Sequence, residues 1–498
     1  MSLGCLSEIR AKFTRWRRQD EIGSALFALL GDSLVYLVGS ASIGLAGAIL
    51  LPLYTRHLDP DAFGAYALVD AALQVTLILL GMGFNVSYLR WYADDPDQPE
   101  LLGSVFLLSV GVALVGGLAL WAGLASPWGA ALVRWPTGSF AWTVAPLCVL
   151  GVIINLFLTD LRARRAATTF SVASVVRFVG MVGGAVWFVA VRKAGVAGVL
   201  YGRVASDTLT AIVLSVVCMP RIRWQVIWRL IRPMLRFGLP LILSGLAMML
   251  LNISGRYFLS HYATLKEVGL YTAASKVANV MQFLFVQPFG IAWGGLMFQI
   301  AKWERARTIY SKIFTYTFVA SIVIALLAAL FAPALFALLT SAAYMLAIGI
   351  FPLLLLSLAL LALQYPAAIG IYLEGKTSLF PTIFAAGLGA CLAGNRLLVP
   401  AYGMLGAAVA GVIGQGVILV LMMVLGQRYY SIRYEVKSMT VIGLLCGVAF
   451  VIGRCFAPTL GFEDMVLQTV LAASVLLSVG LFVWWDLSRT RARMGAYV

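Results

Sequence analysis

Apolar runs long enough to cross a lipid bilayer recur from one end of the chain to the other. The first lies near residues 31–54 and the last near 465–486, and short connections join them. A hydrocarbon core of about 30 Å is crossed by roughly twenty apolar residues in a helix. Lipid offers no hydrogen-bond partner to backbone N–H and C=O groups, so each run must satisfy its own groups as a helix. The runs therefore predict an all-α polytopic membrane protein.

Fourteen transmembrane helices are predicted from these runs. Their expected bounds are 31–54, 64–88, 102–125, 141–161, 169–191, 195–219, 236–259, 268–296, 309–334, 345–373, 378–399, 403–426, 439–456 and 465–486. The composition agrees, because 62% of the residues are hydrophobic and 11% are charged, whereas a soluble domain is about half apolar and a quarter charged. No connection is long enough for a soluble nucleotide-hydrolysing domain.

Lysine and arginine residues set the expected orientation. If the N-terminus is cytoplasmic, most of the 36 basic residues fall on the cytoplasmic side, as the positive-inside rule requires. They lie at 10–18, Arg90, 161–165, 221–236, 302–312, Lys376, 427–437 and 489–493. We therefore expect a multi-pass membrane protein with both termini in the cytoplasm. The net charge of +16 then favours anionic lipids as partners. No nucleic acid is expected, because the charge is dispersed over separate loops.

The remaining polar chemistry of the chain is sparse. Residues 1–30 form a basic segment without the apolar core of a cleavable signal peptide. This segment is expected either as an amphipathic helix on the inner leaflet or as a disordered tail. The six cysteines show no C-x-x-C spacing, and the only histidines are His57 and His261. No catalytic residue, metal or cofactor is therefore predicted.

Two pairs of segments repeat along the chain at nearly the same offset. FGAYALVDAALQV at 63–75 aligns with VGLYTAASKVANV at 268–280, which places Gly64 on Gly269. AGVAGVLYGRVASDTL at 194–209 aligns with YGMLGAAVAGVIGQGV at 402–417. In the second alignment Gly195, Gly198 and Asp207 fall on Gly403, Gly406 and Gln415.

Such repeats predict two lobes related by an axis along the membrane normal, a transporter architecture. Six helices separate the copies, so both copies keep one orientation. The expected domains are an N-lobe at 31–220, a C-lobe at 221–430, and two added helices with a basic tail at 431–498.

The pattern resembles the MOP superfamily of exporters and, within it, the polysaccharide flippases of the O-antigen type (Wzx). The resemblance is carried by LLPLYTRHLDPDAFGAYALVDAALQV at 50–75, VGLYTAASKVANV at 268–280 and GMLGAAVAGVIGQ at 403–415. It implies a V-shaped bundle in which helices 1, 2, 7 and 8 border a central cavity. The implied cargo is an isoprenoid-diphosphate-linked oligosaccharide, moved from the inner to the outer leaflet. A polysaccharide polymerase and export machinery are implied as partners.

Six of the charged residues inside the predicted spans mark the candidate site. They are Asp32, Asp70, Arg177, Arg203, Asp207 and Lys276. Each costs about 2.5–3.5 kcal/mol at the centre of a membrane helix, so these groups are expected to face one another or water. Arg203 and Asp207 have the i, i+4 spacing of a pair within one helix. The repeat predicts that Asp70 and Lys276 lie on opposite walls of one cavity.

A basic cavity of this kind suits a diphosphate, because arginine donates two parallel hydrogen bonds to phosphate oxygens. The predicted substrate-binding residues are Lys276, Arg177, Arg203, Asp70, Asn279, Gln282, Gln74 and Asn252. Gln287, Tyr66, Tyr271 and Phe283 are further candidates for sugar contacts. Asp32, Asp70 and Asp207 are candidates for ion coupling. The lipid tail is expected to stay in the bilayer at the gap between the lobes.

Two other functions stay open at the level of sequence. One is a cation-coupled drug exporter of the related MATE type, with Asp32 as its protonation site. The other is a membrane enzyme, such as a polymerase or ligase of the same glycan. Ethidium efflux from cells that produce the protein separates the exporter from the flippase. An enzyme of this kind usually needs an extended outer loop, which the chain lacks.

Overall fold

The structure, a computed structural model, describes residues 46–95, 98–127, 140–456 and 462–495. In these ranges every regular element is a helix, so the predicted all-α class is confirmed for the described part of the chain. The basic segment at 1–30, the start of the predicted span 31–54 and Asp32 lie outside the described residues.

The helices follow one another with short connections. After a helical segment at 46–57, the first half contains α3 (Pro60–Leu80), α4 (Phe84–Asp94), α5 (Pro99–Ala125), η1 (Ala141–Thr143), α7 (Val144–Ala163), α8 (Ala167–Ala185), the π-helical turn η2 (Val186–Val191), α9 (Gly195–Cys218) and η3 (Met219–Arg221). The second half contains α10 (Trp228–Tyr262), α11 (Leu265–Met281), the π-helical turn η4 (Gln282–Val286), α12 (Gln287–Ile300), α13 (Ala306–Leu330), α14 (Ala332–Leu339), η5 (Ala342–Gly349), α15 (Phe351–Ala367), α16 (Ile369–Leu373), η6 (Thr377–Leu379) and α17 (Phe380–Tyr429). The last two helices are α18 (Val436–Phe456) and α19 (Phe462–Gly495).

Ten helices in the described residues are long and apolar enough to cross a membrane. The longest of these stretches, Thr377–Tyr429, covers two predicted spans, 378–399 and 403–426. The predicted span 268–296 corresponds to α11, η4 and α12, which are not among the ten and which carry Lys276. Every predicted span from 64–88 onward coincides with one or more helices, so the multi-pass helical fold is confirmed.

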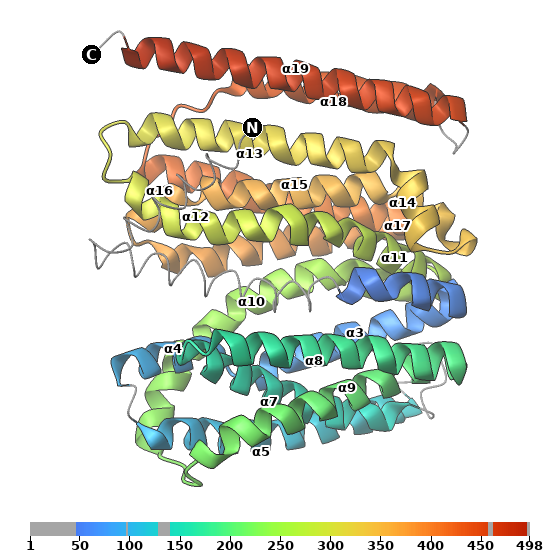
Figure 1. Ribbon diagram of the computed structural model, residues 1–498, viewed down its shortest axis with the longest axis vertical. Coiled ribbons are helices and arrows are strands. Elements are labelled where there is room, and N and C mark those ends of the chain that lie inside the picture. The colour runs from blue at the N-terminus through green and yellow to red at the C-terminus, as the bar shows by residue number, and fades with distance from the viewer. Residues whose placement is uncertain (1–45, 96–97, 128–139, 457–461, 496–498) are drawn as a thin grey trace, which may run out of the picture.

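Two groups of helices form the two lobes of the bundle, and α10 runs between them (Figure 1). In the first lobe, α8 packs along α9 and α5 along α7, while in the second α10 and α15 pack along α17. Helices α3 and α11 meet between the lobes, and α18 and α19 lie at the outer edge of the second lobe, beside α13. The domain boundaries at residues 220 and 430 stay a prediction.

One pair of glycines that align between the repeats shares a positive φ. Gly195 at the start of α9 has a φ of 59°, and Gly403 has a φ of 52°. Positive φ is a conformation that glycine adopts without steric cost. Gly403 breaks the helical geometry within the long α17 and thereby separates the two predicted spans. The predicted repeat is therefore visible in the local structure.

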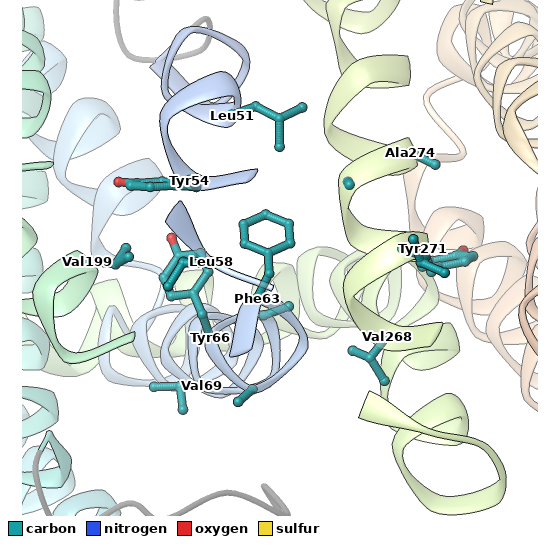
Figure 2. Close-up of a cluster of buried hydrophobic side chains, with 14 of the residues drawn as sticks. Leu51, Tyr54, Leu58, Phe63, Tyr66, Val69, Val199, Val268, Tyr271 and Ala274 are labelled. Carbon is teal, nitrogen blue, oxygen red and sulfur yellow. The ribbon is translucent and has the colours of Figure 1, made fainter. Parts of the chain in front are cut away.

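The lobes touch where α3 crosses α11. A Cβ atom on Gly64 would lie 2.2 Å from the carbonyl oxygen of Leu265, and one on Gly269 would lie 1.9 Å from that of Pro60. Small residues let two helix backbones come this close. The two glycines aligned by the repeat therefore face each other across the lobe boundary. Figure 2 shows the side chains of 51–58, α3 and α11 that surround this crossing.

Tyr344 in η5 adds a second contact between the lobes at the same end of the bundle. Its hydroxyl donates to the carbonyl oxygen of Leu58 at 3.0 Å, and its ring meets that of Phe63 edge-on at 5.9 Å. Burial raises the pKa of the Tyr344 phenol, and Asp59 and Asp61 raise it further. The hydroxyl therefore stays protonated and keeps its role as donor.

The opposite end of the bundle is also bridged, because α10 begins against the first lobe. A Cβ atom on Gly83 would lie 2.5 Å from the carbonyl oxygen of Gly238. The guanidinium of Arg90 on α4 lies 4.6 Å from the ring centre of Phe237. Helix α10 then crosses to pack along α17 in the second lobe. Backbone contacts between the lobes therefore exist at both ends of the central space.

The segment GIYLEGKT at 370–377 has the G-x-x-x-x-G-K-[ST] spacing of a phosphate-binding loop. In such a loop, free backbone N–H groups between a strand and a helix hold the phosphates. Here the N–H of Lys376 bonds to the carbonyl of Ile371 and that of Gly375 to the carbonyl of Tyr372. With a φ of 65° at Gly375, this is the C-terminal cap of α16. The spacing therefore marks a helix end, without phosphate-binding geometry.

Candidate functional site

Two adjoining cavities lie between the lobes, with volumes of about 570 and about 260 Å³. Four residues line both: Asp70 and Gln74 on α3, and Lys276 and Asn279 on α11. The larger cavity extends toward α8 and α9, and the smaller one toward α10 and α15. Asp70 and Lys276 thus lie on one site, contributed by helices from different lobes, as the repeat predicted.

More helices border this site than the family resemblance implied. Helices 1, 2, 7 and 8 correspond to the segment 46–57, α3, α10 and α11, and all four contribute residues. Arg177 on α8 and Arg203 on α9 extend the wall of the larger cavity. Leu358 on α15 closes the smaller cavity.

An ion-pair network connects α3, α8 and α9. Arg203 donates from Nη1 to Oδ1 of Asp70 at 2.7 Å, and Gln74 donates from Nε2 to Oδ2 of the same carboxylate at 2.7 Å. Arg177 donates from Nε to Oδ1 of Asp207 at 2.8 Å. The predicted pair between Arg203 and Asp207 is present, but its N–O distance is 3.9 Å. These five residues are called the N-lobe network below.

Small residues bring α8 close enough to α9 for this network. A Cβ atom on Gly184 would lie 2.7 Å from Cα of Gly202, so the two backbones are in contact at this crossing. Further along the same interface, the Ser206 hydroxyl donates to the carbonyl oxygen of Arg177 at 2.8 Å. Asp207 is only 1% exposed and does not line either cavity. Its ion pair with Arg177 therefore also holds α8 against α9.

The second lobe contributes two cations of a different kind. Among the described residues, neither Lys276 on α11 nor Arg256 on α10 has an ion-pair partner within 4.0 Å. Both line the smaller cavity. The Nε atom of Arg256 is buried and has no hydrogen-bond partner in the described part of the chain. A buried donor without a partner is costly, and opposite charges attract, so an anion in this cavity gains stabilisation from both residues.

Arg256 is a site residue that the sequence analysis missed. It lies three residues before the expected end of the span 236–259, so it was not among the six charged residues chosen as the candidate site. Helix α10 instead continues to Tyr262. A signal was available, because Arg256 follows Asn252 by four residues and such residues share one helix face.

Amide and aromatic side chains complete the walls. Asn279 lines both cavities, Gln287, Tyr66 and Phe283 line the larger one, and Asn252, Gln282 and Tyr271 line the smaller one. Gln282 and Phe283 belong to the π-helical turn η4, and single π-helical turns are frequent at functional sites. Every predicted substrate-binding residue therefore lines at least one of the two cavities. Their roles stay predictions, as does ion coupling at Asp70 and Asp207.

In sequence, residues 29–301 match the model of a family described as polysaccharide biosynthesis protein. The matched stretch is more than half of the 498 residues. The chain belongs to the polysaccharide biosynthesis protein family. No curated protein matches the chain.

This family member is similar to solved structures of MOP superfamily transporters. The lipid II flippase MurJ in an inward closed conformation has a TM-score of 0.68 at 11% identity, covering 93% of this chain and 98% of that one. An inward-facing multidrug resistance transporter of the MATE family has a TM-score of 0.63 at 15% identity, covering 82% and 96%. A MOP superfamily transporter from Pyrococcus furiosus, described by the reverse polarity of its binding pocket, has a TM-score of 0.51 at 18% identity, covering 80% and 95%. The fold of the superfamily, expected from the resemblance, is confirmed.

The stretch matched to the polysaccharide biosynthesis protein family contains all the described charged residues of the site. These are Asp70, Arg177, Arg203, Asp207, Arg256 and Lys276. Helices α13 to α19 lie beyond the matched stretch. The family match therefore covers the N-lobe network and both Lys276 and Arg256.

Proposed function

We propose that this protein is a flippase for a lipid-linked oligosaccharide. It moves an isoprenoid-diphosphate-linked oligosaccharide from the inner to the outer leaflet of a bacterial inner membrane, by alternating access of the two lobes. The glycan then enters O-antigen, capsule or exopolysaccharide synthesis, with a polymerase and export machinery as partners. The observation that carries the proposal is the charge balance of the cavities.

The cavity charges match a diphosphate. The N-lobe network contains two arginines and two carboxylates and is therefore neutral. Lys276 and Arg256 add two positive charges, and neither has a carboxylate within 4.0 Å in the part of the chain that the structure describes. A diphosphate diester carries one negative charge on each phosphate group and balances these two. Arginine also binds phosphate oxygens through parallel donors, while lysine acts as a compact point charge.

The other wall residues suit an oligosaccharide. Asn279 and Gln282 provide amide donors and acceptors, and Tyr66 and Phe283 provide ring faces. Sugars present hydroxyl groups and apolar C–H faces, so they use both kinds of side chain. The larger cavity, bounded by the N-lobe network, is therefore assigned to the first sugars and the smaller cavity to the diphosphate.

Binding to the purified protein in nanodiscs tests this proposal. A lipid-linked diphosphate oligosaccharide should bind to the wild type, and the double variant Lys276→Met/Arg256→Met should lose most of the affinity. The same oligosaccharide without diphosphate and lipid should bind weakly to both proteins. Equal affinities of the wild type and the double variant for the full ligand would contradict the proposal.

The likeness to a multidrug resistance transporter supports a second candidate, a cation-coupled drug exporter of the MATE type. Lys276 and Arg256, which line the smaller cavity, count against it, because they repel cationic drugs. Ethidium efflux that depends on the protein and is lost in Asp32→Asn or Asp70→Asn would favour the exporter. Under the flippase proposal, ethidium efflux equals that of cells without the protein.

A further inference from the structure

An apolar crevice of about 620 Å³ lies in the second lobe, between α10, α15, α16 and α17. Its walls are mostly hydrocarbon and aromatic side chains, including Met248, Tyr365, Phe384 and Met422. The amide of Gln364 also reaches the crevice, but it already donates to Oε1 of Gln415 at 2.7 Å. The crevice is therefore an apolar compartment, unlike the two charged cavities.

A row of residues on α10 leads from this crevice to the charged site. Pro240, Ser244 and Met248 line the crevice, while Asn252 and Arg256 line the smaller cavity. These five residues are spaced by four, so they form one i±4n ridge, which winds around the helix as it advances. A ligand that follows this ridge passes from an apolar wall to an amide and then to a guanidinium.

Helix α15 shows the same transition on the facing wall. Leu358 and Leu361 line the smaller cavity, and Leu361 and Tyr365 line the crevice. Leu361 therefore belongs to both spaces. Because both helices make the same transition, the crevice and the charged site form one amphipathic surface with an apolar and a charged end.

The far end of the crevice reaches the surface at the connection between α16 and α17. Thr377 and Ser378 line this end and are exposed. Beside them the rings of Tyr372 and Phe380 lie 4.9 Å apart, and those of Phe380 and Phe384 lie 6.0 Å apart. A hydrocarbon chain thus has an aromatic-lined path from the surface to the edge of the charged cavity.

We propose that this crevice binds the hydrocarbon tail of the cargo while the diphosphate lies at Lys276 and Arg256. The inference rests on the proposed function, and it assigns the tail a protein site in place of the bilayer at the gap between the lobes. The ligand class is a long isoprenoid or similar hydrocarbon joined to a diphosphate. Because burial of apolar surface is favourable and grows with the buried area, binding depends on tail length.

The test compares two diphosphates in nanodiscs made of phosphatidylethanolamine and phosphatidylglycerol. One is a long-chain polyprenyl diphosphate and the other a short-alkyl diphosphate. The wild type should bind the long-chain ligand at least about tenfold more tightly. Ser244→Trp, which fills the crevice, should remove this advantage and leave the short-alkyl affinity unchanged. Leu243→Trp is the matched control, because Leu243 is the adjacent residue and is 62% exposed.

Photo-cross-linking of the wild-type protein is a second test of the inference. A polyprenyl diphosphate with a diazirine in its tail should label peptides from 361–384, and excess unlabelled polyprenyl diphosphate should prevent the labelling. Equal affinity of the wild type for both diphosphates would overturn the inference and leave the flippase proposal standing. Labelling of 361–384 that only phospholipid displaces would assign the crevice to a bilayer lipid and overturn the inference. No binding of either diphosphate would overturn the proposed function itself.

Discussion

Lys276 and Arg256 differ from the other cavity cations in what surrounds them. Arg203 and Arg177 each have a carboxylate oxygen within 2.8 Å, whereas Lys276 and Arg256 have none within 4.0 Å among the described residues. An arginine that already holds a carboxylate gains less from a phosphate than an unpaired cation does. At the scale of single residues, we therefore expect the second lobe to dominate binding of the diphosphate.

Replacing either unpaired cation by methionine should weaken binding of the lipid-linked diphosphate. A hydrogen bond to a charged group contributes about 1.5–3 kcal/mol, so Lys276→Met and Arg256→Met should each lower the affinity by roughly 10- to 100-fold. The amount of protein in the membrane should not change. Arg396→Met is the control, because Arg396 is exposed on α17 and packs on the Tyr262 ring. Wild-type affinity in both cavity variants would mean that these cations do not bind the cargo.

The Arg177–Asp207 pair, in contrast, should contribute to the stability of the fold, because it holds α8 against α9. Breaking a buried ion pair costs about 3–5 kcal/mol, whereas replacing both partners by apolar residues is often neutral. Arg177→Met should therefore lower the thermal unfolding midpoint, and Arg177→Met/Asp207→Leu should recover most of the loss. A double variant with a lower unfolding midpoint than Arg177→Met would contradict this, because it would show that the charges stabilise the fold through groups other than each other.

Residue-level prediction from the sequence succeeded where the repeat supplied information. The alignment brought Asp70 and Lys276 to one site, because equivalent positions in two lobes face a common axis. Helical spacing gave only contacts within α9, so the closer Arg203–Asp70 pair between helices was not predicted. Arg256 was missed because hydropathy fixes the end of a helix less well than its centre.

At the scale of helices, the crossing of α3 and α11 decides how closely the lobes meet. Gly64 and Gly269 permit backbone contact at this crossing, and Tyr344 adds a hydrogen bond to Leu58 nearby. The alignment of the two glycines was read from the sequence, but their contact was not, because a repeat does not tell which equivalent positions lie next to the axis. The crevice beside α15 was likewise not predictable, since it arises from four helices distant in sequence.

Gly269→Leu should force the lobes apart at this crossing. Its side chain would meet the backbone of Pro60, where even a Cβ atom would lie 1.9 Å from the carbonyl oxygen. Spin labels at Arg56 and Lys266, both exposed, should then show a longer distance distribution than in the unsubstituted protein, and flipping should fall. Gly389→Leu is the control, because no atom lies within 4 Å of its added Cβ. An unchanged distance would mean that this contact does not hold the lobes together.

For the whole molecule, hydropathy and the repeat together gave the fold: the helices from 64–88 onward, two lobes and two added C-terminal helices. The orientation rests on the basic loops alone. We expect the loops at 161–165, 221–236, 302–312 and 427–437 to face the cytoplasm. Single cysteines in each should react with a membrane-impermeant thiol reagent only after the cells are opened. Reaction of any two in intact cells would overturn the fourteen-helix topology.

Flipping in proteoliposomes tests the central claim most directly. A fluorescent lipid-linked diphosphate oligosaccharide is placed in both leaflets, and the fraction accessible to an added glycosidase is followed over time. With the wild type, the inner pool should become accessible, whereas Lys276→Met/Arg256→Met at equal reconstitution should leave most of it protected, as empty vesicles do. An inner pool that stays protected with the wild type, or becomes accessible equally fast with the double variant, would contradict a flippase that recognises its cargo through these two cations.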